Sequence, residues 1–238
     1  MVSESRAAVG APETAFVLDL DGTLVDSVYQ HVMAWRQALS DVGVPFSVWQ
    51  VHRRIGMSGG LLVEAVSREA GKGLTDAESE KAKALHDRYY AETVETISPL
   101  PGARELIRNL RECEYKWAIA TSGHLTDAEP MLELLGLTVG ETQLVTSEDV
   151  SAAKPDPQLF LTAARLLDVD PASAVVLGDS VWDMLAARRA GCIGIGLMSG
   201  GFSSAELIEA HSFRVYADAA DFLRHVDELG VRFPTNKG

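Results

Sequence analysis

The amino-acid sequence predicts an α/β protein in which a parallel β-sheet is covered by helices on both faces and carries an all-helical insertion. An apolar run, Phe16 to Leu18, ends abruptly in polar residues, as buried strands of open α/β sheets do. From residue 98 onward, strand-like segments alternate with helical ones, which favours a parallel sheet. Between these two parts, residues 28–97 show no convincing strand. We therefore expect an inserted helical domain after the first strand.

The insertion shows helical periodicity from its start. Val32, Trp35 and Leu39 recur at three- and four-residue steps, which predicts a helix over 29–42. Glycines at 56–60 are expected to break the chain before it resumes helical structure. Further helices are expected over 47–55, 61–70 and 75–96, the last with capping-box spacing at Thr75 and Glu78.

A linker rich in proline and glycine, 98–102, separates the insertion from the second part of the sheet. Strands are expected over 117–120, 144–146, 175–177, 193–197 and 214–216, and helices over 103–111, 127–135, 157–167, 181–190, 204–210 and 219–229. The predicted organisation is thus a disordered tail over 1–14, an α/β core over 15–27 and 98–238, and a helical cap over 28–97.

Composition narrows the possible partners. The chain has 238 residues, 47% of them hydrophobic, which is ample for a core, and a formal net charge of −13, which would repel a nucleic acid. No apolar segment approaches the ~20 residues that span a bilayer, and the first 14 residues lack a signal-peptide pattern. Two cysteines suggest neither a disulfide framework nor a zinc site. We expect a cytoplasmic protein without membrane or nucleic-acid partners, either a monomer or a weak homodimer.

Two carboxylates stand at the end of the first predicted strand. Side chains alternate along a strand, so Asp19 and Asp21 leave on one side while Leu20 points to the other. Like charges this close are tolerated best when a cation lies between them or when one holds a proton. The alternative is an ordinary acidic turn without chemistry.

Three later stretches end strands and carry polar groups. Thr121-Ser122-Gly123 offers a hydroxyl and backbone N–H groups that could surround a phosphate oxygen, although such a sequence is often only a turn. Lys154, followed by Pro155, is held on a loop, or is simply a solvated lysine. Asp179 and Asp183, one helical turn apart, suit Mg²⁺ as hard oxygen ligands, or merely favour a helix N-terminus.

The stretch 19–27, DLDGTLVDS, resembles the first signature of the haloacid-dehalogenase-like hydrolases in its phosphatase form. The three later stretches resemble the second, third and fourth motifs of that family, in the same order and each at a predicted strand end. The resemblance implies that Asp19 is the nucleophile and Asp21 the general acid and base, in a Mg²⁺-dependent phosphatase with an aspartyl-phosphate intermediate. It also implies Thr121, Ser122, Gly123 and Lys154 at the phosphate, with Thr121 and Lys154 taking part in catalysis, and Asp19, the backbone carbonyl of Asp21, and Asp179 at Mg²⁺, with Asp183 beside them.

Within that family the chain looks most like the phosphoglycolate-phosphatase and β-phosphoglucomutase branch, with a Rossmann-like core, an inserted cap and a small phosphorylated metabolite as substrate. His31, near the start of the cap, is a possible substrate contact. In mutases of this branch an Arg follows the cap's Gly-x-Ser, and here that position is Gly59. This favours transfer to water, although Arg53, Arg54 or Arg68 could supply the missing charge from elsewhere on the cap.

Two further alternatives are weaker. A phospho-Asp signalling receiver also combines acidic residues, a hydroxyl, a lysine and Mg²⁺, but ordinarily lacks a second Asp two residues after the first and needs no cap. A carbon–halogen hydrolase of the same family lacks the Asp at position 21, because halide release needs no proton.

Glycines over 191–199 do not complete a dinucleotide-binding loop. The five histidines besides His31 are scattered and expected to be packed or solvated, and Arg53 and Arg54 are expected on a solvated helix face.

Overall fold

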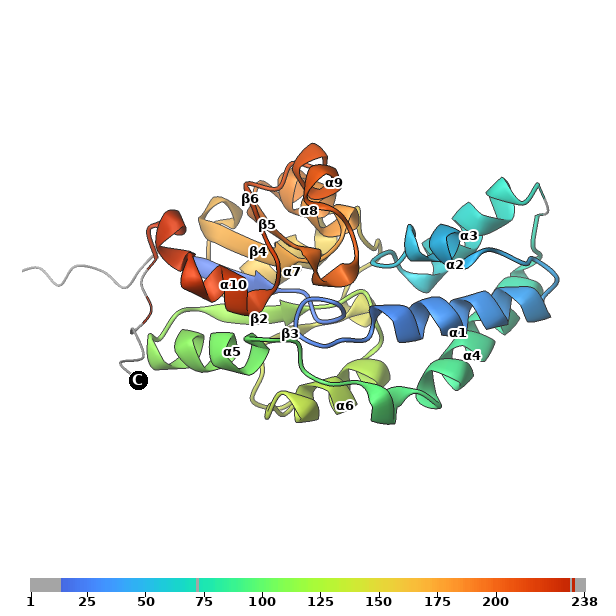
Figure 1. The fold of residues 1–238 in the computed structure, drawn as a ribbon, viewed down its shortest axis with the longest axis horizontal. Coiled ribbons are helices and arrows are strands. Elements are labelled where there is room, and N and C mark those ends of the chain that lie inside the picture. Colours follow the sequence, from blue (N-terminus) through green and yellow to red (C-terminus); the bar gives the residue numbers. More distant parts are fainter. Residues whose placement is uncertain (1–13, 72, 232, 234–238) are drawn as a thin grey trace, which may run out of the picture.

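The computed structural model describes residues 14–71, 73–231 and 233 and contains one six-stranded sheet in which all neighbouring strands are parallel. The predicted tail lies almost entirely outside the described residues. Helices cover both faces of the sheet, and a second group of helices lies beyond one end of the strands (Figure 1). The strands are β1 (Ala15–Leu18), β2 (Trp117–Ala120), β3 (Leu144–Val145), β4 (Ala174–Gly178), β5 (Ile193–Leu197) and β6 (Arg214–Tyr216). The predicted Rossmann-like α/β core is confirmed.

Strand β1 lies at the centre of the sheet. The strand order is β3-β2-β1-β4-β5-β6, so the chain builds outward from β1 first on one side and then on the other. Leu18 is in register with Ile119 of β2 and with Leu177 of β4. Open α/β sheets bind ligands where the strand order reverses, beyond the carboxyl ends of the strands. The residues that follow β1 and β4 therefore occupy the expected position for a site.

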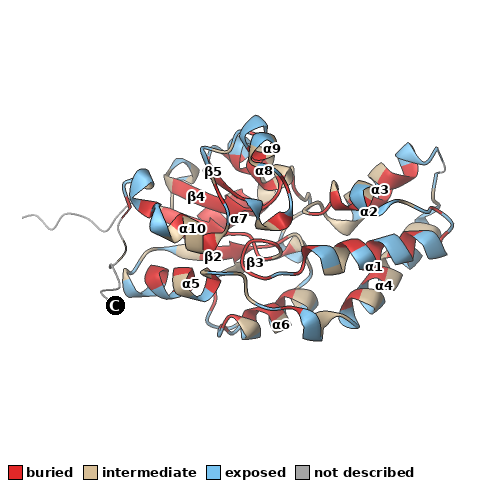
Figure 2. Ribbon diagram, viewed as in Figure 1, coloured by how far each residue is buried: buried red, intermediate tan, exposed pale blue. Residues whose placement is uncertain are grey.

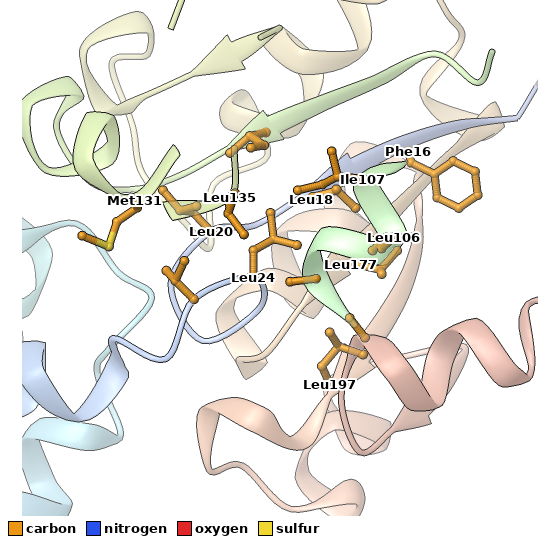
Figure 3. Packing of buried hydrophobic residues seen from close by; sticks show 14 of the residues in the cluster. Phe16, Leu18, Leu20, Leu24, Leu106, Ile107, Met131, Leu135, Leu177 and Leu197 are labelled. Carbon is orange, nitrogen blue, oxygen red and sulfur yellow. The ribbon is translucent and has the colours of Figure 1, made fainter. Parts of the chain in front are cut away.

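Alternation along β1 divides its side chains between two cores. Phe16 and Leu18 pack in the larger hydrophobic cluster, together with Leu106 and Met131 (Figure 3). Val17 belongs to the smaller cluster on the other face. All four residues of β1 are buried, as are all five of β4, and these central strands lie in the buried interior of the sheet domain (Figure 2). This burial fixes the register of β1, and with it the direction in which Asp19 and Asp21 leave the strand.

Among the described residues, six α-helices belong to the sheet domain. They are α5 (Ala103–Glu112), α6 (Leu125–Leu134), α7 (Gln158–Leu166), α8 (Val181–Ala190), α9 (Ser204–Glu209) and α10 (Ala219–Arg224). Short 3₁₀ turns are formed by Ser147–Asp149, Pro171–Ser173, Met198–Gly200 and Val226–Leu229. The single helix predicted over 219–229 is thus wrong in detail, because the backbone of His225 leaves the helical region (φ −125°) and the chain continues as a 3₁₀ turn.

The inserted segment is all helical, as predicted. It contains α1 (Val28–Asp41), α2 (Val48–His52), α3 (Gly59–Glu69) and α4 (Asp76–Ala91), followed by the 3₁₀ turn Val94–Thr96. These helices enclose a hydrophobic cluster of their own, which includes Trp35 and Leu39. The predicted glycine break is shorter than expected: Ser58 caps α3 by accepting a hydrogen bond from the backbone N–H of Leu61, so Gly59 already lies in the helix.

Two adjacent connections join the helical cap to the sheet domain. The backbone N–H of Asp26 donates to the carbonyl of Ser98 (2.9 Å), and that of Leu100 donates to the carbonyl of Leu24 (2.9 Å). The outgoing and returning chain segments therefore run side by side at the carboxyl edge of the sheet, which places the cap over that edge (Figure 1). Within the described part of the chain, no helix combines the length and apolar character needed to cross a bilayer.

Candidate active site

Three buried carboxylates form the floor of the site. Asp19 follows β1, Asp179 follows β4, and Asp183 lies in the first turn of α8. One oxygen atom from each side chain lies within 4.8 Å of the corresponding atoms of the other two. Strands β1 and β4 are neighbours, so their ends meet although Asp19 and Asp179 are far apart in sequence. We refer to these three side chains as the acidic trio.

Lys154 lies against the acidic trio. Its Nζ is 2.6 Å from Oδ1 of Asp19 and 2.7 Å from Oδ1 of Asp183, and its side chain is fully buried. Burial lowers the pKa of the ammonium, but the neighbouring charges of Asp183 and Asp19 outweigh that effect and leave the pKa above its usual value. Lys154 therefore stays protonated. The sequence predicted the lysine near these carboxylates, and the structure brings them together.

The capping box of α8 orients Asp183. Its Oδ2 accepts hydrogen bonds from the backbone N–H (3.1 Å) and the hydroxyl of Ser180. Its Oδ1 is left facing Lys154, at ion-pair distance but without the alignment of a hydrogen bond. Asp183 was predicted to stand beside the metal ligands, and the structure puts its carboxylate oxygen in the same cluster as theirs.

The acidic trio carries more negative charge than Lys154 can offset. Burial and the charge of Asp183 raise the pKa of Asp19 to about 7. Burial, Asp183 and Asp19 together raise the pKa of Asp179 well above its usual value. A buried cluster of hard oxygen donors that resists ionisation fits a divalent cation such as Mg²⁺.

Gly22 allows the loop after β1 to approach Asp179. Its backbone has φ +75°, and a Cβ atom there would fall 2.4 Å from Oδ2 of Asp179. Any other residue would push the carboxylate away or strain the turn. The hydroxyl of Thr23 also points to Asp179, at 3.4 Å from Oδ1. The glycine of the DLDGT stretch is thus explained by contact with a strand end far away in sequence.

Asp21 lies outside the acidic trio and is held by one residue just before the cap and one in its first helix. The hydroxyl of Ser27 donates to its Oδ1 (2.6 Å), and Nε2 of His31 lies 3.3 Å from the same atom. Burial raises the pKa of Asp21, but His31 and the hydrogen bond from Ser27 more than compensate, so the pKa is below its usual value. Asp19 and Asp21 thus have pKa values shifted in opposite directions by their different surroundings.

The turn after β2 lies beside Asp21. The hydroxyl oxygen of Thr121 accepts a hydrogen bond from the backbone N–H of Gly123 (3.0 Å), and a Cβ atom on Gly123 would lie 4.0 Å from Oδ2 of Asp21. The hydroxyl of Ser122 instead donates to the carbonyl of Gly56 in the cap (3.2 Å). The predicted phosphate-binding role of these three residues stays a prediction, and Ser122 additionally connects core and cap.

A cavity of about 340 Å³ lies between the core and the cap. The core contributes the acidic trio members Asp19 and Asp179, with Asp21 and Lys154. Both cap residues that the sequence singled out, His31 and Gly59, line the same cavity. The lining from the cap also includes Trp35, Lys83, His86 and Asp87, and the lining from the core also includes Asp127 of α6.

Sequence reasoning missed the last five of these lining residues. His86 was expected to be packed or solvated; it is packed, stacked on Trp35 at 4.2 Å between ring centroids, and also reaches the cavity. The spacing of His31 and Trp35, and of Lys83 and Asp87, puts each pair on one helix face. That signal was available, but the face that meets the cavity depends on how α1 packs on α4.

Arg53 and Arg54 do not share the solvated helix face that was predicted. Arg53 forms an ion pair with Glu206 of α9, and Arg54 forms one with Glu69 of α3. The first pair joins the cap to the core, whereas the second lies within the cap. His52 also crosses this boundary, with Nε2 2.7 Å from the carbonyl of Gly200. The reason is that α2 packs against the α9 side of the core.

Comparison with known proteins agrees with this geometry. The sequence model of the haloacid dehalogenase-like hydrolases matches residues 13–191. The chain is 37% identical over 187 residues to a plasmid-encoded phosphoglycolate phosphatase of Cupriavidus necator (78% of this chain, 80% of the relative), and 32% identical over 221 residues to validoxylamine A 7′-phosphate phosphatase of Streptomyces hygroscopicus (92% and 95%). A crystal structure of a hydrolase from Pseudomonas syringae superposes with a TM-score of 0.89 at 46% identity, covering 91% of this chain and 99% of that one.

The chain belongs to the haloacid dehalogenase-like hydrolases. Within that family it is an enzyme of the phosphatase kind, since the two relatives named above carry phosphatase names. The strand ends also bring together the buried carboxylates and the lysine.

Proposed function

We propose that the protein is a Mg²⁺-dependent phosphatase that hydrolyses a small phosphate monoester through an aspartyl-phosphate on Asp19. The observation that carries this proposal is the contact of Lys154 Nζ with Asp19 Oδ1 inside a buried cluster of carboxylates. A surface lysine or an acidic turn would have no reason to be buried in this way, because isolated buried charges are costly. The cluster makes sense if a phosphate dianion and a cation join it.

In the first step, an oxygen of Asp19 attacks phosphorus and the bond from phosphorus to the leaving oxygen breaks. Asp21 gives its proton to that oxygen, so the alcohol leaves neutral. In the second step, Asp21 takes a proton from water, the water oxygen attacks phosphorus, and the bond to Asp19 breaks to release phosphate. Lys154, the Thr121 hydroxyl and the backbone N–H groups after it would stabilise the charge on the phosphoryl oxygens.

Asp21 must be protonated when it acts as the general acid in the first step, and the bound substrate would favour that form. Its pKa is lowered in the free protein by His31 and Ser27, but a bound phosphate dianion beside it would favour the protonated form. Asp19, the backbone carbonyl of Asp21, and Asp179 would hold Mg²⁺, with Asp183 beside them. When bound, the ion would offset the repulsion between the Asp19 carboxylate and the phosphate dianion.

We further propose residues 28–97 as a lid, and residues 15–27 with 98–238 as the catalytic core, with hinges near 26–29 and 97–102. Support comes from the cavity, which is lined from both parts, and from the paired connections that join them. Closure would exclude bulk water and complete the pocket. A cytoplasmic location, a monomer or weak homodimer, and the lack of nucleic-acid and membrane partners stay predictions.

Phosphoryl relocation within a sugar, as in β-phosphoglucomutase, is the alternative. It needs a cation on the cap to hold a second phosphate. A Cβ atom on Gly59 would lie 2.9 Å from Cζ2 of Trp35, so the indole ring fills the space that a side chain at position 59 would use. Arg53, Arg54 and Arg68 pair with Glu206, Glu69 and Glu64, respectively, and none of the three lines the described cavity.

Two assays test the proposal. Hydrolysis of an aryl phosphate is expected to require Mg²⁺ and to fall at least about 10⁴-fold in Asp19→Asn, because a neutral amide is not a competent nucleophile. Asp227→Asn, an exposed residue outside the site, serves as the matched control. Full activity in excess chelator, or an active Asp19→Asn variant, would refute the assignment. Conversion of a hexose 1-phosphate to its 6-phosphate faster than phosphate release would support the mutase instead.

A further inference from the structure

We propose that the leaving-group side of the cavity selects a neutral polyhydroxy group, so that the substrate is a sugar or polyol monophosphate and not an ester with a second anionic group. This inference rests on the proposed phosphatase function and concerns the part of the cavity away from the acidic trio. Three features of that part of the cavity support it: the acidic residues there, the lack of an unpaired lysine or arginine among the described lining residues, and the aromatic surface of Trp35.

Two carboxylates face the cavity from opposite sides of the cap–core boundary. Asp87 comes from α4 of the cap and Asp127 from α6 of the core, and both line the cavity. Burial and the charge of Asp87 raise the pKa of Asp127, so the two groups lie near enough to repel each other. A leaving group between them that carried a carboxylate or a second phosphate would add a third negative charge. Like charges brought together at a binding surface are strongly unfavourable.

The cap offers little positive charge in compensation. Apart from Lys154 at the floor, Lys83 is the single lysine or arginine among the described residues that line the cavity. Its Nζ forms an ion pair with Glu80 at 2.7 Å. Arg53, Arg54 and Arg68 form ion pairs with glutamates outside the cavity, as described above. A second anion would therefore meet two carboxylates, one lysine that is already paired, and no arginine among the described lining residues.

The same part of the cavity suits hydroxyl groups. Carboxylate oxygens of Asp87 and Asp127 accept hydrogen bonds, and sugar hydroxyls are the natural donors. Trp35 supplies an aromatic surface, held by stacking on His86 and reaching into the space above Gly59. A cavity of about 340 Å³ is at the small end of the usual range for ligand pockets, which fits a single sugar or polyol.

Two substrates that differ at one end of the carbon chain test the inference. Glucitol 6-phosphate ends in a CH₂OH group where 6-phosphogluconate ends in a carboxylate. At the same free Mg²⁺ concentration, kcat/KM is expected to be at least about tenfold higher for glucitol 6-phosphate, the size of a modest like-charge repulsion. Equal values, or preference for 6-phosphogluconate, would overturn the inference.

Single-residue variants show which side chains cause the preference for glucitol 6-phosphate. The measured quantity is the ratio of kcat/KM for glucitol 6-phosphate to kcat/KM for 6-phosphogluconate. Asp127→Asn and Asp87→Asn are each expected to reduce this ratio at least about threefold by raising activity on 6-phosphogluconate. Glu129→Gln, an exposed residue of α6 outside the cavity, is the control and should leave the ratio unchanged. If Lys83 held an anion, Lys83→Gln would lose activity selectively on 6-phosphogluconate, and that result would also overturn the inference. Aryl phosphate hydrolysis, measured in parallel, reports separately on the phosphatase function itself.

Discussion

The floor of the cavity and its wall, which we define as Trp35, Lys83, Asp87 and Asp127, differ in how far their charged groups are exposed to water. On the floor, Lys154 and the acidic trio are all buried, and their charges balance only in part. On the wall, the side chain of Asp87 is 52% exposed and that of Lys83 is 37% exposed, so water shares in their solvation. Buried charges interact strongly and tolerate little change, whereas exposed ones are screened. The floor is therefore suited to chemistry and the wall to selection among substrates.

After the loss of the nucleophile Asp19 itself, the largest effect is expected at Asp21, which lies beside the floor. Asp21→Asn should lower kcat about 10²- to 10⁴-fold with little change in KM, because its proton moves only in the transition state. Steady-state kinetics on an alkyl phosphate measure both constants. A loss confined to KM would contradict the role of Asp21 as acid and base and would weaken the contrast between floor and wall.

Substitutions in the floor should also lower the stability of the protein. Lys154→Met leaves three buried carboxylates without their ammonium partner, and we expect the free energy of unfolding to fall by about 3–5 kcal/mol. Urea unfolding measures this, with Lys116→Met as the control, since the side chain of Lys116 lies at the surface and donates to the carbonyl of Asp168. Adding Asp183→Asn should restore part of the loss, because it removes one unpaired charge. A Lys154→Met protein as stable as the control would contradict the account.

Metal addition should stabilise the protein in a pH-dependent way. In the metal-free protein the pKa of Asp19 is about 7, above its ordinary value of 3.8. The stability that comes from its proton is full below about pH 4 and is lost as the pH rises through about 7. Mg²⁺ replaces that proton, so the rise in Tm on adding Mg²⁺ should be several degrees larger near pH 8 than near pH 5.5. Equal rises at both pH values would argue against metal binding at Asp19.

The smallest effect is expected from neighbouring arginines of the cap. Arg53→Met removes the ion pair with Glu206 that crosses from cap to core and should raise KM about two- to fivefold, the range of a partly exposed ion pair. Arg54→Met removes only a pair within the cap and is the matched control for KM. Thermal unfolding of both variants shows whether the cap is intact. Equal KM values in the two variants would mean that the cap–core ion pair does not stabilise the closed cap.

The contrast between floor and wall also explains which parts of the structure could be predicted from the sequence. The residues of β2, β5 and β6 were predicted to the residue, because a buried strand followed by a turn has a local pattern. Parallel strands bring their carboxyl ends to one edge, so Asp19, Lys154 and Asp179 could be expected to meet before any coordinates were known. The motifs lie at those ends, and the floor of the site was therefore accessible to sequence reasoning.

The wall was not. Trp35 and His86 meet only because α1 packs on α4, and Asp127 faces Asp87 only because the cap lies over the core. None of these contacts has a local signature. Gly59 was expected in a loop because two adjacent glycines disfavour a helix, yet the Ser58 cap includes both in α3. Tertiary packing decided each of these positions.

The central claim is that Asp19 carries the phosphoryl group. Borohydride reduces an acyl phosphate to an alcohol, so trapping during turnover of an aryl phosphate should convert the modified aspartate to homoserine, which peptide mass spectrometry can locate. The Asp21→Asn variant should accumulate more of the intermediate, because its second step lacks a base. The account predicts homoserine at position 19 and nowhere else. Trapping at Asp179 or Asp183, or turnover with no trapped residue in either protein, would contradict it.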